Sequence, residues 1–282
     1  MKSLLLVKLS FFPLLIFGQV TIDTTKYYDT SNVGTVKKIT NEKVCAIVFF
    51  VSGPDADWKP EEKYKTLQRD QESLRQLNTQ LARYGEKLDI HFEVFNLEKD
   101  FKVDSVFDIT KHKRLSKRHI TDFNRDNAKI IWTYYMLSDV PFFDSKEYLN
   151  YSGGYFLLIY HQGMGRTNAS PRITCNSRHS DIPEFVTIYQ KTLNNKPTHI
   201  RSTSHEILHL FGAWDLYRDG FYGHDLETYL MIRKEYPKSI MRKLRDSQID
   251  SLTAWRIGLN DKPKDWYLNV VPKAYHKSTY QK

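Results

Sequence analysis

Cysteine is scarce in this chain of 282 residues, which contains only Cys45 and Cys175. Neither cysteine stands at metal-ligand spacing from another cysteine or from a histidine, so the sequence excludes a cysteine-based zinc site. In an exported protein the two cysteines could form one disulfide bond, and two separate buried thiols are the alternative. The sequence does not decide between these arrangements.

Long apolar segments, low-complexity stretches and internal repeats are also absent beyond the first residues. After residue 18 no apolar segment is long enough to cross a bilayer, so we expect no membrane span once the leader is removed. The chain is nevertheless 40% hydrophobic and contains 18 Tyr and 16 Phe. This content can bury a full core, either as one domain or as a domain with two lobes.

Residues 1–18 have the features of a secretory signal peptide, with Lys2, an apolar run and the small residue Gly18 at the end. We expect cleavage after Gly18 and a secreted or periplasmic location. An uncleaved N-terminal anchor is the alternative, but Lys8 and Pro13 leave only a short apolar stretch. A lipid-anchored lipoprotein would need a cysteine at the cleavage site, and none stands there.

Basic residues outnumber acidic ones by 42 to 33, and the formal net charge is +9. The charges are interspersed, with one basic run at residues 111–119. Such a run could meet an acidic or nucleic-acid partner, but it also fits a solvated loop or helix face. Because no nucleic-acid-binding motif accompanies it, we expect no nucleic-acid partner.

The first part of the chain predicts a β–α–β unit. A helix is expected over residues 60–84, where apolar residues recur at helical spacing between Pro60 and the stop signal Gly85. A right-handed crossover of this kind joins parallel strands. Residues 101–127 look irregular, with short helices as the alternative, and residues 162–183 look like a long loop. Strands are expected at residues 44–53, 88–97, 129–137, 153–161 and 184–192.

Helices dominate the expectation for the C-terminal part. They are predicted over residues 199–211, 226–236 and 250–259, the last with Asp250 or Ser251 as N-cap. Residues 238–241 predict a tight turn. After the signal peptide we expect an extended arm at residues 19–43.

The segment SHEILHLFGAWD, residues 204–215, carries the chemistry. His205 and His209 are four residues apart, so on a helix both imidazoles project from one face and can bind one metal ion. Glu206 lies beside them as a candidate proton acceptor. Gly212 permits a turn that ends the helix, and Asp215 then supplies an oxygen ligand. The alternative is a core helix whose two histidines are satisfied by hydrogen bonds.

The chemistry of this donor set is that of a catalytic zinc site. Two histidines and one aspartate leave a fourth position open for water, whose pKa the zinc lowers toward neutrality. Glu206 can accept the proton of that water and pass it to a leaving amine. Asp215 is not the sole candidate for the third ligand, because Glu227, Glu235 and His224 also follow the helix.

This segment resembles the metzincin signature His-Glu-x-x-His-x-x-Gly-x-x-His, with Asp215 in place of the last histidine. It is similar to the Asp-bearing variants of snapalysin-like and immune-inhibitor-like secreted bacterial peptidases. Ser239, Ile240 and Met241 resemble the Met-turn of that family, and residues 250–259 resemble the helix that follows it. Lys243 stands where some members have a tyrosine ligand. The resemblance covers roughly residues 44–260.

The resemblance implies a zinc-dependent endopeptidase with a mixed α/β (α+β) fold. We then expect a twisted, mostly parallel sheet of about five strands with a backing helix, an active-site helix and a smaller, mostly helical C-terminal lobe. Residues 44–282 would form one catalytic domain, with an upper lobe at 44–212 and a lower lobe at 213–282. The protein would be a monomer. A non-catalytic binding protein on the same scaffold is the alternative, and the presence of Glu206 argues against it.

The resemblance also implies how a polypeptide substrate would bind. It would lie extended in a cleft and pair with an edge strand, for which residues 153–161 are the first candidate and residues 184–192 the second. Residues shortly after Met241 would form the wall of a side-chain pocket.

Overall fold

The computed structural model describes ten parts of the chain, and the predicted signal peptide and most of the arm lie outside them. No helix among the described residues is both long and apolar enough to cross a membrane. The described parts are residues 39, 43–52, 57–95, 101–102, 117–137, 151, 154–170, 183–217, 226–260 and 262–269.

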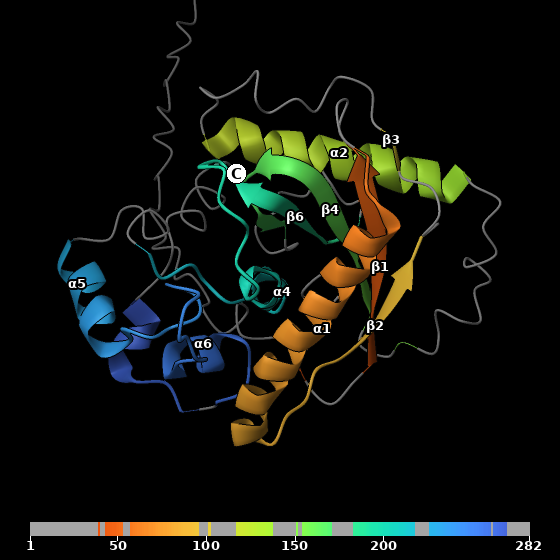
Figure 1. The fold of residues 1–282 in the computed structure, drawn as a ribbon. Coiled ribbons are helices and arrows are strands. Elements are labelled where there is room, and N and C mark those ends of the chain that lie inside the picture. The colour runs from red at the N-terminus through yellow and green to blue at the C-terminus, as the bar shows by residue number, and fades with distance from the viewer. Residues whose placement is uncertain are drawn as a thin grey trace, which may run out of the picture.

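A mixed α/β fold is built around a six-stranded, mostly parallel sheet (Figure 1). The strand order is β2-β1-β4-β6-β5, and β3 pairs with β1 beyond the end of β2. All pairings are parallel except that of β5 with β6. The strands are β1 (Lys43–Ser52), β2 (Asp89–Val94), β3 (Phe101–Lys102), β4 (Tyr155–Gly165), β5 (Asn168–Ser170) and β6 (Phe185–Thr192).

Strand β1 runs through the core, and its nine residues after Lys43 are all buried. This burial on both faces explains why its sequence is a continuous apolar run rather than an alternating one. Val44, Ala46 and Val48 pack into one hydrophobic cluster, while Cys45 and Ile47 pack into another on the opposite face. The predicted strands at 44–53, 88–97, 153–161 and 184–192 are confirmed with shifts of a few residues at their ends.

Helix α1 (Pro60–Leu81) connects β1 to β2, as predicted, and packs on the same face of the sheet as helix α4 (Ser202–Leu210) (Figure 1). Pro60 occupies its first turn, where a missing N–H costs nothing. A short 3-10 helix, η3 (Ala82–Tyr84), follows, and Gly85 ends it at φ 75°, a left-handed conformation that glycine adopts without strain.

Helix α2 (Lys117–Leu137) covers the other face of the sheet, so the predicted strand at residues 129–137 is wrong (Figure 1). The same helix also replaces part of the irregular segment expected at 101–127. Its buried positions recur three or four residues apart, at Asn124, Ala128, Ile131 and Tyr135, whereas Ile130 is exposed. That spacing belongs to a helix face, and a strand would have buried every second residue.

The long loop predicted at residues 162–183 is also wrong in part. Strand β4 continues to Gly165, and β5 follows within three residues. Residues 171–182, which include Cys175, lie outside the described residues. Cys45 itself is a buried free thiol, and burial together with the charge of Glu93 raises its pKa to about 12.

The C-terminal helices pack against the same hydrophobic cluster as α1 and α4. Ile232, Met241, Leu252 and Tyr267 are all members of it. Asp250 caps α6 as predicted, because its carboxylate accepts a hydrogen bond from the Thr253 backbone N–H. These elements are α5 (Leu226–Glu235), α6 (Ser251–Arg256) and the 3-10 helix η7 (Asp265–Asn269).

Candidate metal centre

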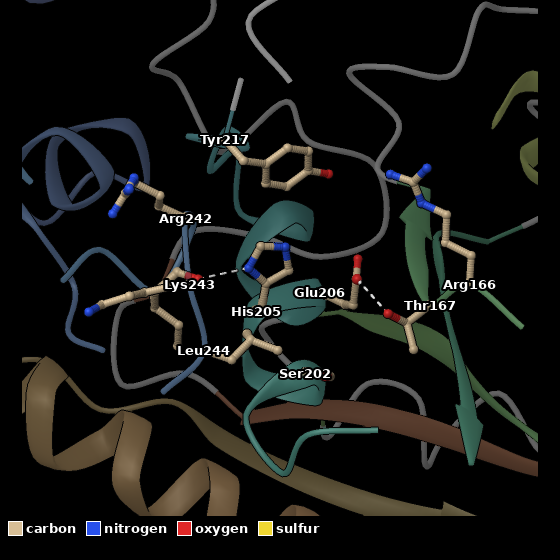
Figure 2. Close-up of a pocket in the computed structure, with 10 residues that line it drawn as sticks. Arg166, Thr167, Ser202, His205, Glu206, Tyr217, Arg242, Lys243 and Leu244 are labelled. Carbon is tan, nitrogen blue, oxygen red and sulfur yellow. Dashed lines mark hydrogen bonds between the residues drawn. The ribbon is translucent and has the colours of Figure 1, made fainter. Parts of the chain in front are cut away.

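A cavity of about 320 Å³ opens beside helix α4 (Figure 2). Its floor includes His205, Glu206 and Ser202 from the helix itself. On one side it is bounded by Arg166 and Thr167, which connect β4 to β5. The other side is formed by residues of the turn region near Met241, namely Ile240, Arg242, Lys243 and Leu244.

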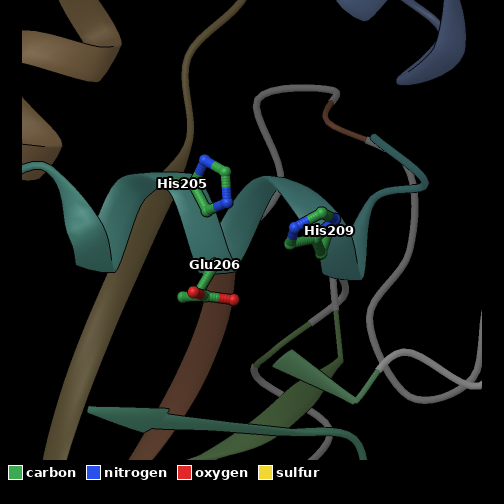
Figure 3. A group of neighbouring side chains, drawn as sticks. All are labelled: His205, Glu206 and His209. Atoms are coloured by element: carbon green, nitrogen blue, oxygen red, sulfur yellow. The ribbon is translucent and has the colours of Figure 1, made fainter. Parts of the chain in front are cut away.

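Helix α4 brings His205, Glu206 and His209 together, and these three residues form a group that could hold a metal ion (Figure 3). Their candidate ligand atoms all lie within 4.8 Å of one another. The helix packs against the core through Ile207, Leu208 and Leu210, which are fully buried. The face that carries the two histidines and Glu206 therefore remains available to line the cavity. The amphipathic pattern of the sequence thus orients the polar face toward the cavity.

Both imidazoles are held by backbone carbonyls. Nδ1 of His205 lies 2.9 Å from the oxygen of Ile240, and Nδ1 of His209 lies 2.8 Å from the oxygen of Ala213. A carbonyl oxygen can only accept a hydrogen bond, so each Nδ1 must carry the proton. The lone pair of each neutral ring is therefore on Nε2, the tautomer that a metal ligand requires.

Asp215 approaches both of these nitrogen atoms. Its Oδ1 lies 3.2 Å from Nε2 of His205 and 3.2 Å from Nε2 of His209. Ligand atoms bound to one tetrahedral zinc ion at the usual bond lengths are about 3.3 Å apart. Oδ1 is buried, and the two imidazole nitrogens are the groups that approach it. The donor set and its spacing fit a metal ion.

Gly212 makes the return of the chain to the helix possible. Its φ is 98°, and its N–H bonds the carbonyl of His209, so the helix ends there in a left-handed turn. Three residues later the chain has reversed far enough for Asp215 to face the two histidines. The turn thus brings the backbone close enough for the short aspartate side chain to reach both imidazoles.

Electrostatic coupling among these groups is strong without a metal ion. Burial lowers the pKa of His209, but the charge of Asp215 outweighs it and raises that pKa to about 9. The same opposition raises the pKa of His205. Burial would raise the pKa of Asp215, yet the two imidazoles hold it well below its usual range. The carboxylate is therefore ionised and ready to bind a cation.

The other candidates for a third ligand are placed differently. Glu235 forms an ion pair with Lys264 and accepts a hydrogen bond from the Tyr236 hydroxyl. Glu227 is an exposed residue in the first turn of α5. His224 lies outside the described residues. Among the described candidates, Asp215 is thus the one whose carboxylate meets both imidazoles.

Glu206 is buried, with 6% of its surface exposed, and its carboxylate points into the cavity (Figure 2). The Thr167 hydroxyl donates a hydrogen bond of 3.1 Å to its Oε1. Thr167 directly precedes β5, so the edge of the sheet orients this carboxylate. No local pattern predicted this contact, because the two residues are 39 positions apart.

The sheet edge beside the site is β5, not either of the two strands expected there. Strand β4 lies between β1 and β6, so residues 153–161 are interior, whereas β5 covers β6 only at Phe185–Thr187. The first candidate, residues 153–161, is therefore not an edge strand, and Asn168, Ala169 and Ser170 add an antiparallel strand to the beginning of the second. On its other side β5 pairs with no strand of the described chain.

Met241 is completely buried in the hydrophobic core. Its carbonyl accepts the Leu216 N–H at 2.8 Å, and its own N–H donates to the Ser239 hydroxyl at 3.1 Å. The first contact links the turn to the residue after Asp215. The neighbouring carbonyl of Ile240 accepts a hydrogen bond from His205. The turn therefore contacts both a histidine of the candidate site and the residue after Asp215.

Tyr217 is a site residue that the sequence did not reveal. Its hydroxyl donates a hydrogen bond to Oδ2 of Asp215 and lies at the rim of the cavity (Figure 2). Burial and then the charge of Asp215 raise the pKa of Tyr217, so the phenol stays a neutral donor. It thereby fixes the carboxylate that faces the histidines. The local indication in the sequence was that Tyr217 follows Asp215 by only two residues.

A polar joint fixes α4 against the backing helix α1. Asp70 is fully buried and accepts hydrogen bonds from the hydroxyls of Tyr160 and Thr203. One turn farther along α1, the hydroxyls of Ser73 and Ser204 bond each other at 2.6 Å. Thr203 and Ser204 immediately precede His205, so the joint holds the start of the helix that carries the ligands.

No known protein-family model matches this chain, and neither do any curated protein or solved structure.

Proposed function

We propose that this protein is an exported zinc-dependent endopeptidase of the metzincin type, acting as a monomer. The observation that carries the proposal is the convergence of two imidazole nitrogens and one buried carboxylate oxygen beside a second buried carboxylate, Glu206. A purely structural metal site has no need of the second carboxylate. The exported location rests on the sequence of residues 1–18.

Zinc is the metal that this donor set favours. Two imidazoles and one carboxylate are typical ligands of catalytic zinc, and three protein ligands leave a position open. When bound, zinc supplies a Lewis acid that polarises a carbonyl group and makes water acidic. His205, His209 and Asp215 would hold the ion, and the backbone contacts of both histidines would fix their orientation.

The residues of the chain then divide the proton transfers. Glu206 accepts the proton of the attacking water and later donates it to the leaving amine. Thr167 holds Oε1 of this carboxylate, so Oε2 is the oxygen that would take the proton. Tyr217 keeps Asp215 in place from the other side.

A polypeptide is the substrate class that the surroundings favour. Strand β5 has one unpaired edge among the described residues and lies against α4, so an extended peptide could add to the sheet next to Glu206. The cavity beside it could take one side chain, with Arg242, Lys243 and Leu244 as part of its wall. These are the residues that follow Met241.

The test combines metal analysis with cleavage of casein. We expect one zinc ion per chain after dialysis, loss of cleavage with a chelator, and recovery when zinc is added back. His205→Ala should lose both zinc and cleavage. His91→Ala is the matched control, because His91 lies on β2 and pairs with Glu93 instead. Full zinc retention in His205→Ala, or absence of bound metal in the wild type, would contradict the proposal.

A further inference from the structure

Arg166 is a charged residue of the cavity that the proposed metal chemistry does not use. It lies between β4 and β5, next to Thr167, and contributes to the lining together with Glu206 and Tyr217. Its side chain extends so that the guanidinium lies on the same side of the Glu206 carboxylate as the Tyr217 hydroxyl (Figure 2). Its positive charge lowers the pKa of Tyr217, opposing the larger effect of burial.

The guanidinium of Arg166 has no partner among the residues that the structure describes. Other arginines near the site are engaged by the protein. Arg201 donates to Gln76 and to Ser247, and Arg242 donates to the carbonyl of Pro237. Arg256 lies with its guanidinium carbon 3.9 Å from the ring centre of Trp214. Arg166 thus presents unused hydrogen-bond donors to the cavity.

The backbone around Arg166 is fixed, although its side chain is free. The buried side chain of Asn124 donates to the carbonyl of Arg166 at 3.4 Å and also bonds the side chain of Asn168. Tyr189 donates to Asn124 at 2.8 Å, and its ring covers Gly165 so closely that a β-carbon there would overlap it. The backbone position from which the Arg166 side chain reaches the cavity is therefore built into the fold.

The charge of the cavity selects the ligand chemistry. Arg166, Arg242 and Lys243 line it, and Glu206 is the one carboxylate among its lining residues. An arginine fork binds a carboxylate through two parallel hydrogen bonds, which gives both affinity and orientation. A basic side chain of a substrate would instead face a net repulsion.

We propose that Arg166 binds a carboxylate of the peptide substrate next to the scissile bond, which makes the enzyme selective for acidic peptides. This inference rests on the proposed peptidase function, because it assigns the substrate class of the same site. The carboxylate is that of a glutamate or aspartate side chain. A C-terminal carboxylate would present the same group to the guanidinium, but it would lie next to the scissile bond only in a carboxypeptidase.

Binding of labelled peptides separates this inference from catalysis. The protein is the zinc-loaded Glu206→Gln variant, and fluorescence anisotropy measures its affinity. The peptides differ in one residue, Glu or Gln, placed in turn on each side of the central bond, and each ends in a free acid or an amide. We expect one carboxylate position to improve affinity about 10- to 100-fold, as for a charged hydrogen bond.

Adding Arg166→Gln to the Glu206→Gln variant should abolish the preference for Glu peptides over Gln peptides. The affinity for the Gln peptides should stay unchanged. Arg166→Lys should keep part of it, and Arg166→Glu should favour a Lys peptide. Arg75→Gln is the control, because Arg75 is exposed on α1 and pairs with Glu72. If a free C-terminus gives the whole effect, the preference for acidic side chains is wrong and the site binds the end of the chain.

Two further results would overturn the proposal. One is equal binding of all Glu and Gln peptides by the parent protein. The other is a preference that survives in Arg166→Gln. Failure of the wild type to cleave the same peptides would count against the peptidase function alone, because the binding comparison does not depend on turnover.

Discussion

Nδ1 of His205 lies 2.9 Å from the backbone oxygen of Ile240, a residue 35 positions later in the chain. The contact joins the middle of helix α4 to the buried turn that contains Met241. Because the carbonyl fixes the tautomer of the ring, the turn decides which nitrogen faces Asp215. The ligand geometry therefore depends on packing between distant segments as well as on the helix that carries both histidines.

Zinc binding to the metal-free protein should release protons. Burial and the stronger opposing charge of Asp215 leave His209 with a pKa of about 9, so this ring is protonated at pH 7.5. A metal ligand must be neutral, so zinc has to displace the proton. Calorimetric titration in buffers of different ionisation enthalpy should show about one or more protons released for each zinc ion.

The Asp215→Asn variant provides the comparison for this proton release. Without the carboxylate, the charge that favours the protonated imidazoles is gone, so fewer protons are displaced and the zinc affinity falls. A binding enthalpy that is identical in all buffers for the wild type would show that the histidines are already neutral.

Tyr217→Phe should weaken the site without changing the fold. The variant loses the hydrogen bond from the phenol to Oδ2 of Asp215, and the carboxylate becomes free to rotate. Loss of such an outer contact usually costs about 10- to 100-fold in metal affinity or activity. Chelator competition and kcat/KM with a peptide would measure it. Tyr64→Phe, at an exposed position of α1, should change neither quantity.

Asp70→Asn should change how stability depends on pH. Burial raises the pKa of Asp70 to about 7 in the folded protein, despite the opposing effects of Arg69 and the Thr203 hydroxyl, whereas the ordinary value is 3.8. Between these values the folded state holds a proton that the unfolded state has lost. The stability of the wild type therefore falls as the pH rises from about 4 to about 7.

Asp70→Asn has no titratable carboxyl group at this position. As the pH rises from about 4 to about 7, the wild type should therefore lose stability relative to Asp70→Asn. The expected difference is on the order of 1 kcal/mol for each pH unit. Urea denaturation of the metal-free proteins between pH 5 and pH 8 would measure it. Asp126→Asn, at an exposed position of α2, should follow the wild type throughout. A constant gap between wild type and Asp70→Asn would contradict the assignment.

Local patterns predicted the β–α–β unit and most strands, because burial on both faces leaves a readable apolar run. The segment at 129–137 misled the prediction because a short apolar run fits a buried strand and a buried helix equally well. The structure has a helix there, and the buried side chains of Asn124 and Ala128 belong to the same helix face toward the N-terminus of α2. Strand β5 was missed because its three residues have no pattern and its pairing with β6 is not local.

The same difference between local patterns and long-range contacts applies to the residues of the candidate site. His205, Glu206 and His209 could be predicted because one helix brings them together, and Gly212 pointed to the turn that returns Asp215. Thr167 and Arg166 could not be predicted, because the sheet edge that presents them is built by contacts across the chain. The sequence shows which residues can bind a metal, and the long-range contacts determine what surrounds it.

The most direct test of the proposed mechanism is cleavage by the Glu206→Gln variant with its zinc content measured on the same sample. Glutamine keeps the shape of the side chain and can still accept the Thr167 hydrogen bond, but it cannot take a proton. We expect one zinc ion per chain, as in the wild type, and casein cleavage lower by at least about 100-fold. Cleavage at the wild-type rate by the zinc-loaded variant would show that Glu206 is not the base.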